Sequence, residues 1–482
     1  MSEPPIFTRS HWAVLLALLL SAGMTYYQVG LFLPRAMERG AARGLGGGYS
    51  FGNDFYPVWL TSREALLRHR NPYSPEMTRE IQTGLFGRPL DGRSAADPPR
   101  DYRAFAYPVF VDLLFWPLSL LPFPVVRIGL AAALASATAL SIPLWLRALR
   151  RRASPSLLAI VILLTLSSYA VLEGLFAVQP GLMVGFLLAA SFAALTKERL
   201  FAAGSLFAFT LMKPQMSAVV AVFLLLWSFA RWRERCAFAY GFFAWSAALA
   251  ALSLPVWPHW IPEWLHVLSG YSGYSPPPLI TYSLGPRLGP LLGPILTVLL
   301  LAAAAVLIWR MRSVPAASPA FVLTISLLFA LTSITLLPGQ AVYDHVVLLP
   351  GILVILWTWR EVVLSSRPFG VVLVAAALAL FWQWIVVPPL LASRYFLSPA
   401  QFFSNPVFLL PLRAAASVPL AVSAVLGYIM WKAMRDKTSG VRPQTSDLGL
   451  QAPDVGLLTP DSGHPTPKTQ DLRPSLLACF AR

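Results

Sequence analysis

The chain has 482 residues, of which 57% are hydrophobic and only 12% are charged, and its formal net charge is +16. This composition excludes a soluble domain, and because the basic excess falls between apolar runs, it also argues against nucleic acid as a partner. The apolar runs, about twenty residues long, match a hydrocarbon core about 30 Å thick, where backbone groups must be satisfied within helices. The sequence therefore predicts an all-α polytopic membrane protein.

The first apolar run, residues 12–33, is too long for the core of a signal peptide and lacks a small-residue cleavage pattern. We therefore expect it to be retained as the first span. Eleven further apolar segments follow along the chain. The twelve predicted spans are residues 12–33, 123–146, 156–172, 181–196, 200–212, 214–230, 236–256, 289–309, 319–337, 342–359, 369–387 and 407–431.

Positive charge is unevenly divided between the two sets of connections. If the N-terminus is cytoplasmic, the five internal connections on that side hold thirteen Lys and Arg, and the five short outer connections hold three. Short loops follow the positive-inside rule best. We therefore expect a multi-pass cell-membrane protein with both termini in the cytoplasm.

One long connection, residues 34–106, precedes the second span and is expected on the outer side, because a long loop beside a strong anchor translocates despite its charge. Asn53 and Asp54 are candidate N-caps of a helix that has Pro57 in its first turn and extends through residue 67. This helix is expected to lie along the membrane. The first outer loop is therefore predicted to be folded.

Two more helices are expected before the second span. Ser74 is a plausible N-cap and Pro75 suits the first position of a short helix. A third apolar segment, residues 107–121, contains Asp112 and Pro117, and we interpret it as a half-buried or re-entrant helix because counting it as a span would invert every later loop.

The domain plan is a transmembrane unit, residues 1–436, in which residues 34–122 form the first outer loop with its juxtamembrane helices. Residues 437–482 are rich in Pro, Ser and Thr with mixed charge, which is typical of a disordered tail. The two cysteines suggest neither a disulfide framework nor a thiolate metal site.

Several common motifs are absent from the sequence. The glycine-rich stretch 44–52 is followed by no Lys-Ser/Thr and forms no complete GxGxxG pattern, so it predicts no phosphate-cradling loop. The chain has no HExxH motif and no Asp-x-Asp pair, which argues against a zinc hydrolase and a metal-bound nucleotide-sugar transferase. We predict neither a metal nor a cofactor.

Asp54 is the sharpest candidate for chemistry, because it is an acid in the outer loop at the start of a helix near the membrane. An ordinary N-cap explains the same residue, and the two roles are compatible. As a general base, Asp54 would accept a proton from an acceptor hydroxyl, with its protonation controlled by burial and by a nearby Arg such as Arg63.

Lys213 lies where two short apolar runs meet at the predicted outer face, beside Pro214 and Gln215. A lysine there can simply extend its ammonium group to the interface. Alternatively, it supplies a point charge for a lipid phosphate, with Gln215 adding polar capacity.

Two further outer-face positions are candidates. Gln179 lies between the third and fourth predicted spans, and His345 opens the tenth, although a histidine near an interface is commonly a structural hydrogen-bonding residue. Residues 259–282 form a second aromatic outer connection, which is either an interfacial belt or a sugar-stacking surface.

A set of short motifs occurs in a fixed order along the chain: Asn53-Asp54-Phe55-Tyr56, Ala65-Leu66-Leu67, Asn71-Pro72-Tyr73, Tyr107-Pro108, Gln179-Pro180-Gly181 and Leu211-Met212-Lys213-Pro214-Gln215. Together, over roughly residues 12–431, they resemble glycosyltransferase family 87, which contains polyprenyl-phosphate-mannose-dependent α-mannosyltransferases. The chain departs from the family at one point, where it has Tyr107-Pro108-Val109 and a Tyr-Pro-Pro run is expected.

The resemblance implies a GT-C fold whose acceptor site faces away from the cytoplasm. It implies an inverting transfer of a hexose, mannose by the family name, from a polyprenyl-phosphate sugar to the hydroxyl of a glycan or glycolipid. Asp54 matches the catalytic base of the family. The family also suggests a role for a histidine on the outer side near a late span, and His345 is the matching position here. The expected donor-phosphate and substrate residues are Lys213, Gln215, Gln179, His345, Arg63 and Tyr107.

Two other classes of function remain open from the sequence. A transporter or lipid flippase also fits twelve spans with both termini inside, but such proteins are commonly built from matching halves, and this chain has one large loop near its start with no later counterpart. A noncatalytic assembly subunit is the third class, and it would keep its function when Asp54 is replaced by alanine.

Overall fold

The computed structural model describes residues 9–46, 50–90, 97, 102–271, 273–339, 341–363 and 367–438. Within this part of the chain every regular element is a helix, and one isolated bridge joins Pro278 to Pro338. The prediction of an all-α protein is therefore confirmed. The tail predicted to be disordered lies outside the described residues from position 439 onward.

The helices include short 3-10 and π-helical stretches, labelled η. In chain order they are α1 (Arg9–Thr25), η1 (Tyr26–Phe32), α2 (Leu33–Ala42), α3 (Tyr56–Arg68), α4 (Pro75–Phe86), α5 (Phe110–Ser119), α6 (Phe123–Ala148), α7 (Pro155–Leu166), α8 (Tyr169–Ala177), α9 (Gly181–Leu195), α10 (Leu200–Ala208), η3 (Phe209–Met212), η4 (Pro214–Met216), α11 (Ala218–Ala230), α12 (Trp232–Ser253), α13 (Trp260–Tyr271), α14 (Leu279–Leu288), α15 (Leu292–Met311), α16 (Pro319–Thr335), η5 (Val342–Leu348), α17 (Leu349–Val363), α18 (Arg367–Ser393), α19 (Pro399–Ser404), η6 (Pro406–Arg413) and α20 (Ala414–Thr438).

Each of the twelve predicted spans coincides with helix, but the helices differ in length. In the part of the chain that the structure describes, six helical segments are long and apolar enough to cross a membrane, and the pair α7 and α8, bent by 58°, would make a seventh. The remaining predicted spans are shorter apolar helices, and α5, which we interpreted as half-buried or re-entrant, is also short. The chain is thus a polytopic membrane protein, with six to seven candidate spans among its described residues.

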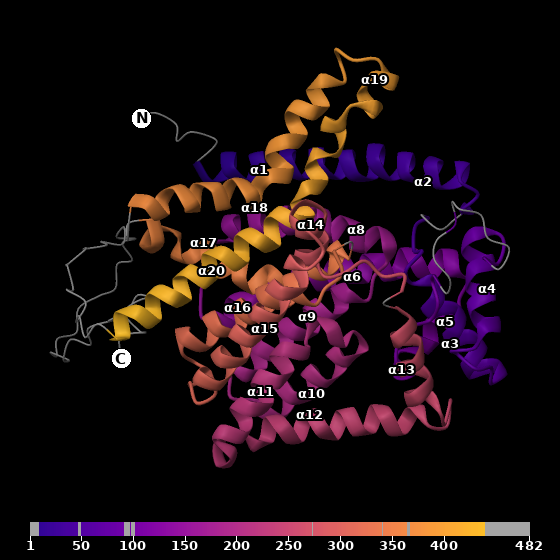
Figure 1. Ribbon diagram of the computed structural model, residues 1–482, viewed down its shortest axis with the longest axis horizontal. Coiled ribbons are helices and arrows are strands. Elements are labelled where there is room, and N and C mark those ends of the chain that lie inside the picture. The colour runs from indigo at the N-terminus through magenta and orange to yellow at the C-terminus, as the bar shows by residue number, and fades with distance from the viewer. Residues whose placement is uncertain are drawn as a thin grey trace, which may run out of the picture.

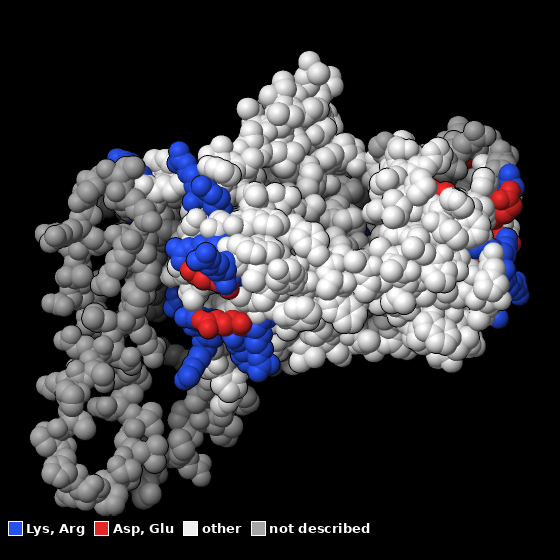
Figure 2. Space-filling view, turned by 90° about the horizontal axis from the view of Figure 1, so that it is seen from below, with Lys and Arg blue, Asp and Glu red and all other residues white. Residues whose placement is uncertain are grey.

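The longest helices run along the molecule, and the first loop lies at one end of it. In Figure 1, α12 and the continuous helix α1–η1–α2 run along the length of the molecule; α3, α4 and α5 gather at one end, and the start of α1 and the end of α20 lie at the other. Figure 2 shows charged side chains at these two ends of the visible face and almost none between them. The uncharged band suits a hydrocarbon slab, so the first loop lies at one edge of that slab.

Two glycines let α10 and α12 approach closely. A Cβ added to Gly204 would lie 2.0 Å from the backbone oxygen of Phe238, and one added to Gly241 would lie 2.2 Å from the backbone oxygen of Phe201. Small residues at helix contacts strengthen packing between membrane helices, where burial from water contributes little.

We expect Gly241→Ala to destabilise the protein by about 1–3 kcal/mol or more, because the backbone atom that its methyl group meets cannot rotate away. The thermal unfolding midpoint in detergent would measure the loss. Gly129→Ala on α6 is the matched control, since a Cβ there meets nothing within 4 Å. Equal unfolding midpoints for the two variants would show that the α10–α12 contact does not limit stability.

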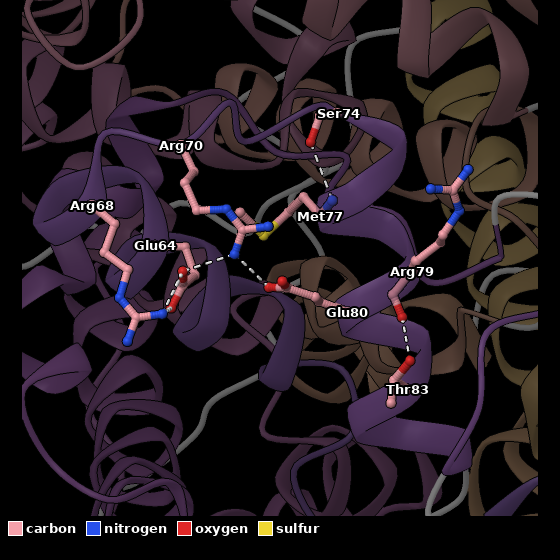
Figure 3. Close-up of polar contacts among 8 residues, drawn as sticks. All are labelled: Glu64, Arg68, Arg70, Ser74, Met77, Arg79, Glu80 and Thr83. Carbon is pink, nitrogen blue, oxygen red and sulfur yellow. Dashed lines mark hydrogen bonds and ion pairs between the residues drawn. The ribbon is translucent and has the colours of Figure 1, made fainter.

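The first loop folds much as its sequence predicts. Ser74 caps α4 by accepting a hydrogen bond from the Met77 backbone N–H at 3.1 Å, and Pro75 is the first helical residue, as predicted. Arg70 follows α3 and donates to Glu64 at 2.9 Å and to Glu80 at 2.7 Å, so one guanidinium joins α3 to α4 (Figure 3). This ion-pair network connects the end of α3 to α4 across the turn between them.

The predicted aromatic connection, residues 259–282, folds largely into α13 and α14. The indole N–H of Trp264 on α13 donates to the Ala106 backbone oxygen at 3.1 Å. The side-chain amide of Asn71 donates to Glu263 at 2.8 Å. Helix α13 therefore lies against the first loop and holds it in place.

Candidate active site

Asp54 lies in the turn that leads into α3, and the end of α8 fixes its backbone. The N–H groups of Gly52 and Asp54 donate to the backbone oxygens of Phe176 and Ala177 at 2.8 and 3.2 Å. Gly52 has a positive φ of 85°, and an added Cβ would lie 3.0 Å from the side chains of Phe123 and Arg127. A side chain is therefore disfavoured at this position both by the backbone and by the space available.

The Asp54 carboxylate does not cap α3. The N-cap residue is Phe55, with no side-chain cap bond, so the prediction of Asn53 or Asp54 as the cap is wrong. One carboxylate oxygen of Asp54 forms an ion pair with Arg103, and the other accepts from the side-chain amide of Gln179 at 2.9 Å. These tertiary partners hold the carboxylate, which is why it is not available to the helix end.

Two residues near Asp54 have a left-handed backbone conformation. Val178 has a φ of 53° and Arg103 a φ of 68°. A positive φ is unusual for residues other than glycine, and above all for a β-branched one such as Val178, where it marks local strain. Val178 separates the end of α8 from Gln179, and Arg103 directs its guanidinium to Asp54, so the strained positions are those that present the two partners of the carboxylate.

Gln179 joins the first loop to the helix bundle. Its amide group donates to Asp54, and its side-chain oxygen accepts from the Tyr107 hydroxyl at 3.0 Å. The Tyr107 backbone oxygen in turn accepts from the Tyr73 hydroxyl at 2.8 Å. Since an amide has a fixed donor side and a fixed acceptor side, Gln179 orients both the carboxylate and the phenol.

Burial and charge set the protonation of this cluster. Burial raises the pKa of Tyr107 well above its usual range, and the carboxylates of Asp54 and Asp344 add to the shift, so the phenol stays a hydrogen-bond donor. Burial works to lower the pKa of Arg103, but the Asp54 carboxylate holds it above its ordinary value. Arg103 is therefore a permanent cation beside Asp54.

A second ion pair lies beside Gly181, the residue two positions after Gln179. Lys213, which separates η3 from η4, pairs with Asp344 of η5 at 2.6 Å, and its ammonium group lies 4.6 Å from the centre of the Tyr343 ring. Gly181 packs directly against this second pair. A Cβ added to it would lie 2.6 Å from an Asp344 carboxylate oxygen and 3.4 Å from the Lys213 ammonium group. The short segment 179–181 therefore connects the two ion pairs: Gln179 hydrogen-bonds Asp54, and Gly181 packs against Lys213 and Asp344.

The other predicted site residues are His345, Gln215 and Arg63, and each has different surroundings. His345 follows Asp344 on η5, and its Nε2 is buried without a hydrogen-bond partner among the described residues. Gln215 is half-buried in η4, two residues after Lys213. Arg63 lies over the Trp59 ring, 5.8 Å from its centre, and the cation that pairs with Asp54 is Arg103.

Sequence reasoning missed Arg103 and the pairing role of Asp344. The first loop holds eleven arginines, and nothing in their spacing distinguishes the one that pairs with Asp54. Asp344 precedes the histidine singled out from the sequence, and an acid at the start of an apolar segment was a usable signal for a buried charge partner. No group of three or more His, Cys, Asp or Glu is placed to hold a metal among the described residues.

Comparison with protein-family models matches residues 105–338 to glycosyltransferase family 87. Comparisons with curated proteins and with solved structures found no match. The match is narrower than residues 12–431 and leaves out Asp54 and His345, but it contains Gln179 and Lys213, whose side chains hydrogen-bond Asp54 and Asp344. The chain is a multi-pass membrane glycosyltransferase of family 87.

Proposed function

We propose that the protein transfers a hexose from a polyprenyl-phosphate sugar to an acceptor hydroxyl, with inversion at the anomeric carbon. The observation that carries this is the Asp54 carboxylate, held between Arg103 and Gln179 and adjoining the buried Lys213–Asp344 pair. A fixed carboxylate beside two cations provides a base for an alcohol and a binding place for a phosphate.

In the reaction, the acceptor hydroxyl gives its proton to Asp54 as its oxygen forms a bond to the anomeric carbon. The bond from that carbon to the phosphate oxygen breaks, and polyprenyl phosphate leaves with the electron pair. Because the phosphate leaves as a stable anion, a second carboxylic acid is not obligatory. A carboxylate offers about four acceptor positions, and Asp54 forms two hydrogen bonds with the described residues, which leaves lone pairs for the proton of the acceptor.

Negative charge grows on the phosphate as the bond breaks, and Lys213 and Arg103 would stabilise it. Asp344 already shares Lys213, so its role is to orient the ammonium while leaving other N–H donors for the phosphate. His345 and Gln215, close in sequence to this pair, would complete the phosphate site. Tyr107 and Gln179 would hold Asp54 in position, and Arg63 is assigned only to the periphery.

We further propose that the transferase unit is residues 1–436, with twelve spans, several of them broken, and with both termini in the cytoplasm. The clustering of α3–α5 at one end, opposite the start of α1 and the end of α20, supports this plan (Figure 1). The site would then face the outer side of the cell membrane and take a glycan or glycolipid acceptor.

The test uses purified full-length protein with polyprenyl-phosphate mannose and two acceptor probes, methyl α-mannoside and a membrane lipid extract. Mass spectrometry should detect a glycosylated product and release of polyprenyl phosphate in equal amounts. Polyprenyl-phosphate glucose in parallel decides the sugar. Movement of the lipid-linked sugar across proteoliposomes with no glycosylated product would instead support a flippase.

A further inference from the structure

A polar pair that the proposed mechanism leaves unused, with one member buried and the other half-buried, lies near Asp54. The side-chain amide of Gln28, on the π-helical stretch η1, donates to the carboxylate of Glu173 on α8 at 2.8 Å. Gln28 is fully buried, with 0% exposure. The two residues are 145 positions apart, so the bond joins the first helix to the short helix that holds the Asp54 backbone.

The Gln28 side-chain oxygen is buried and has no hydrogen-bond partner among the described residues. A buried acceptor without a donor costs free energy, so its retention needs an explanation. The amide cannot turn over to satisfy this oxygen without losing its bond to Glu173. The pair therefore offers an amide oxygen and a carboxylate, both acceptors, to any group that brings hydroxyl donors.

Glu173 is also near the reacting centre. It lies one helical turn before Phe176 and Ala177, whose backbone oxygens accept from Gly52 and Asp54. The carboxylates of Glu173 and Asp54 are close enough to interact electrostatically, and Arg103 lies within the same range of Glu173. The π-helical turn at Gln28 agrees with this placement, because such widened turns occur frequently at functional sites.

We propose that Gln28 and Glu173 form a subsite that binds neighbouring hydroxyls of a sugar ring beside Asp54. This inference rests on the proposed function and adds the part of the site that recognises the sugar. One hydroxyl donates to the free Gln28 oxygen and another to the Glu173 carboxylate, and Gln28 fixes the rotamer of Glu173. The sugar is either the hexose of the donor or the acceptor.

The experiment compares Glu173→Gln and Gln28→Leu with the wild type in steady-state transfer from polyprenyl-phosphate mannose to methyl α-mannoside. We expect KM for one substrate to rise about 10- to 100-fold, the size of a lost hydrogen bond to a charged group, with a smaller change in kcat. A rise for the donor places the donor sugar in the subsite, and a rise for methyl α-mannoside places the acceptor there.

Deoxy analogues separate recognition from a merely structural bond between helices. The wild type should discriminate against the analogue that lacks the bound hydroxyl, and both variants should lose this preference. Glu38→Gln, at an exposed carboxylate on α2, is the matched control and should change nothing. Unchanged preference in the variants, or an equal fall in activity with every analogue together with a lower unfolding midpoint, would overturn the subsite.

Failure of the proposed function would be seen separately, as no transfer by the wild type. Saturation-transfer NMR of the detergent-solubilised protein with methyl α-mannoside and its deoxy analogues then decides the subsite. A signal that Glu173→Gln abolishes supports it. A signal that this variant leaves unchanged, or no signal from the wild type, refutes it.

Discussion

Replacement of Asp54 by asparagine is expected to lower kcat for sugar transfer by about 10²- to 10⁴-fold, the usual contribution of a general base. Asparagine keeps the size of the side chain, and its one side-chain oxygen can still accept from Arg103 or from Gln179, but it cannot take the proton of the acceptor hydroxyl. Initial rates with polyprenyl-phosphate mannose, and donor binding measured by titration, would show the loss of turnover with binding nearly intact.

A loss of stability must be separated from a loss of catalysis, because Asp54→Asn leaves Arg103, whose side chain is only 16% exposed, without its counter-charge. The unfolding midpoint of each variant is therefore measured together with its rate. Glu76→Gln removes an exposed carboxylate from α4 of the same loop and serves as the control. If Asp54→Asn keeps wild-type turnover, Asp54 has no part in the mechanism. A noncatalytic role for the first loop would then explain the structure better.

The sequence predicted the parts of the fold that depend on local composition. Apolar length predicted that each of the predicted span segments is helical, and the Ser74-Pro75 signal predicted the start of α4, because hydrophobicity and capping act over a few residues. What it could not predict was where each span bends. The 58° bend between α7 and α8 falls inside the predicted segment 156–172 and depends on neighbouring helices that satisfy the freed backbone groups. The break at Lys213, between η3 and η4, does fall where two predicted apolar runs meet.

The sequence identified several residues of the candidate site, but it predicted only some of the contacts between them. Gln179, Lys213 and Asp54 adjoin in the structure as their predicted outer-face positions suggested. The cap predicted for Asp54 was wrong because Arg103, 49 residues away, and Gln179, 125 residues away, compete for its carboxylate. Such pairings are set by tertiary packing, which one sequence does not reveal.

The Lys213–Asp344 pair gives the second large expected effect. Lys213→Met should destabilise the protein by about 3–5 kcal/mol, because it leaves the Asp344 carboxylate, with 0% side-chain exposure, without its counter-charge. The same variant should lose about 10²- to 10³-fold in kcat if Lys213 stabilises the departing phosphate. The single variant alone cannot tell the two effects apart.

The double variant Lys213→Met with Asp344→Leu separates them, because it removes both buried charges and replaces them with apolar side chains of similar volume. Its unfolding midpoint should return close to that of the wild type, whereas its kcat should stay as low as in the single variant. Neutralising the exposed pair Arg35 and Glu38 should affect neither quantity, since exposed ion pairs contribute about 0–1 kcal/mol. Recovery of both stability and turnover in the double variant would make the buried pair purely structural and would leave Arg103 as the cation for the phosphate.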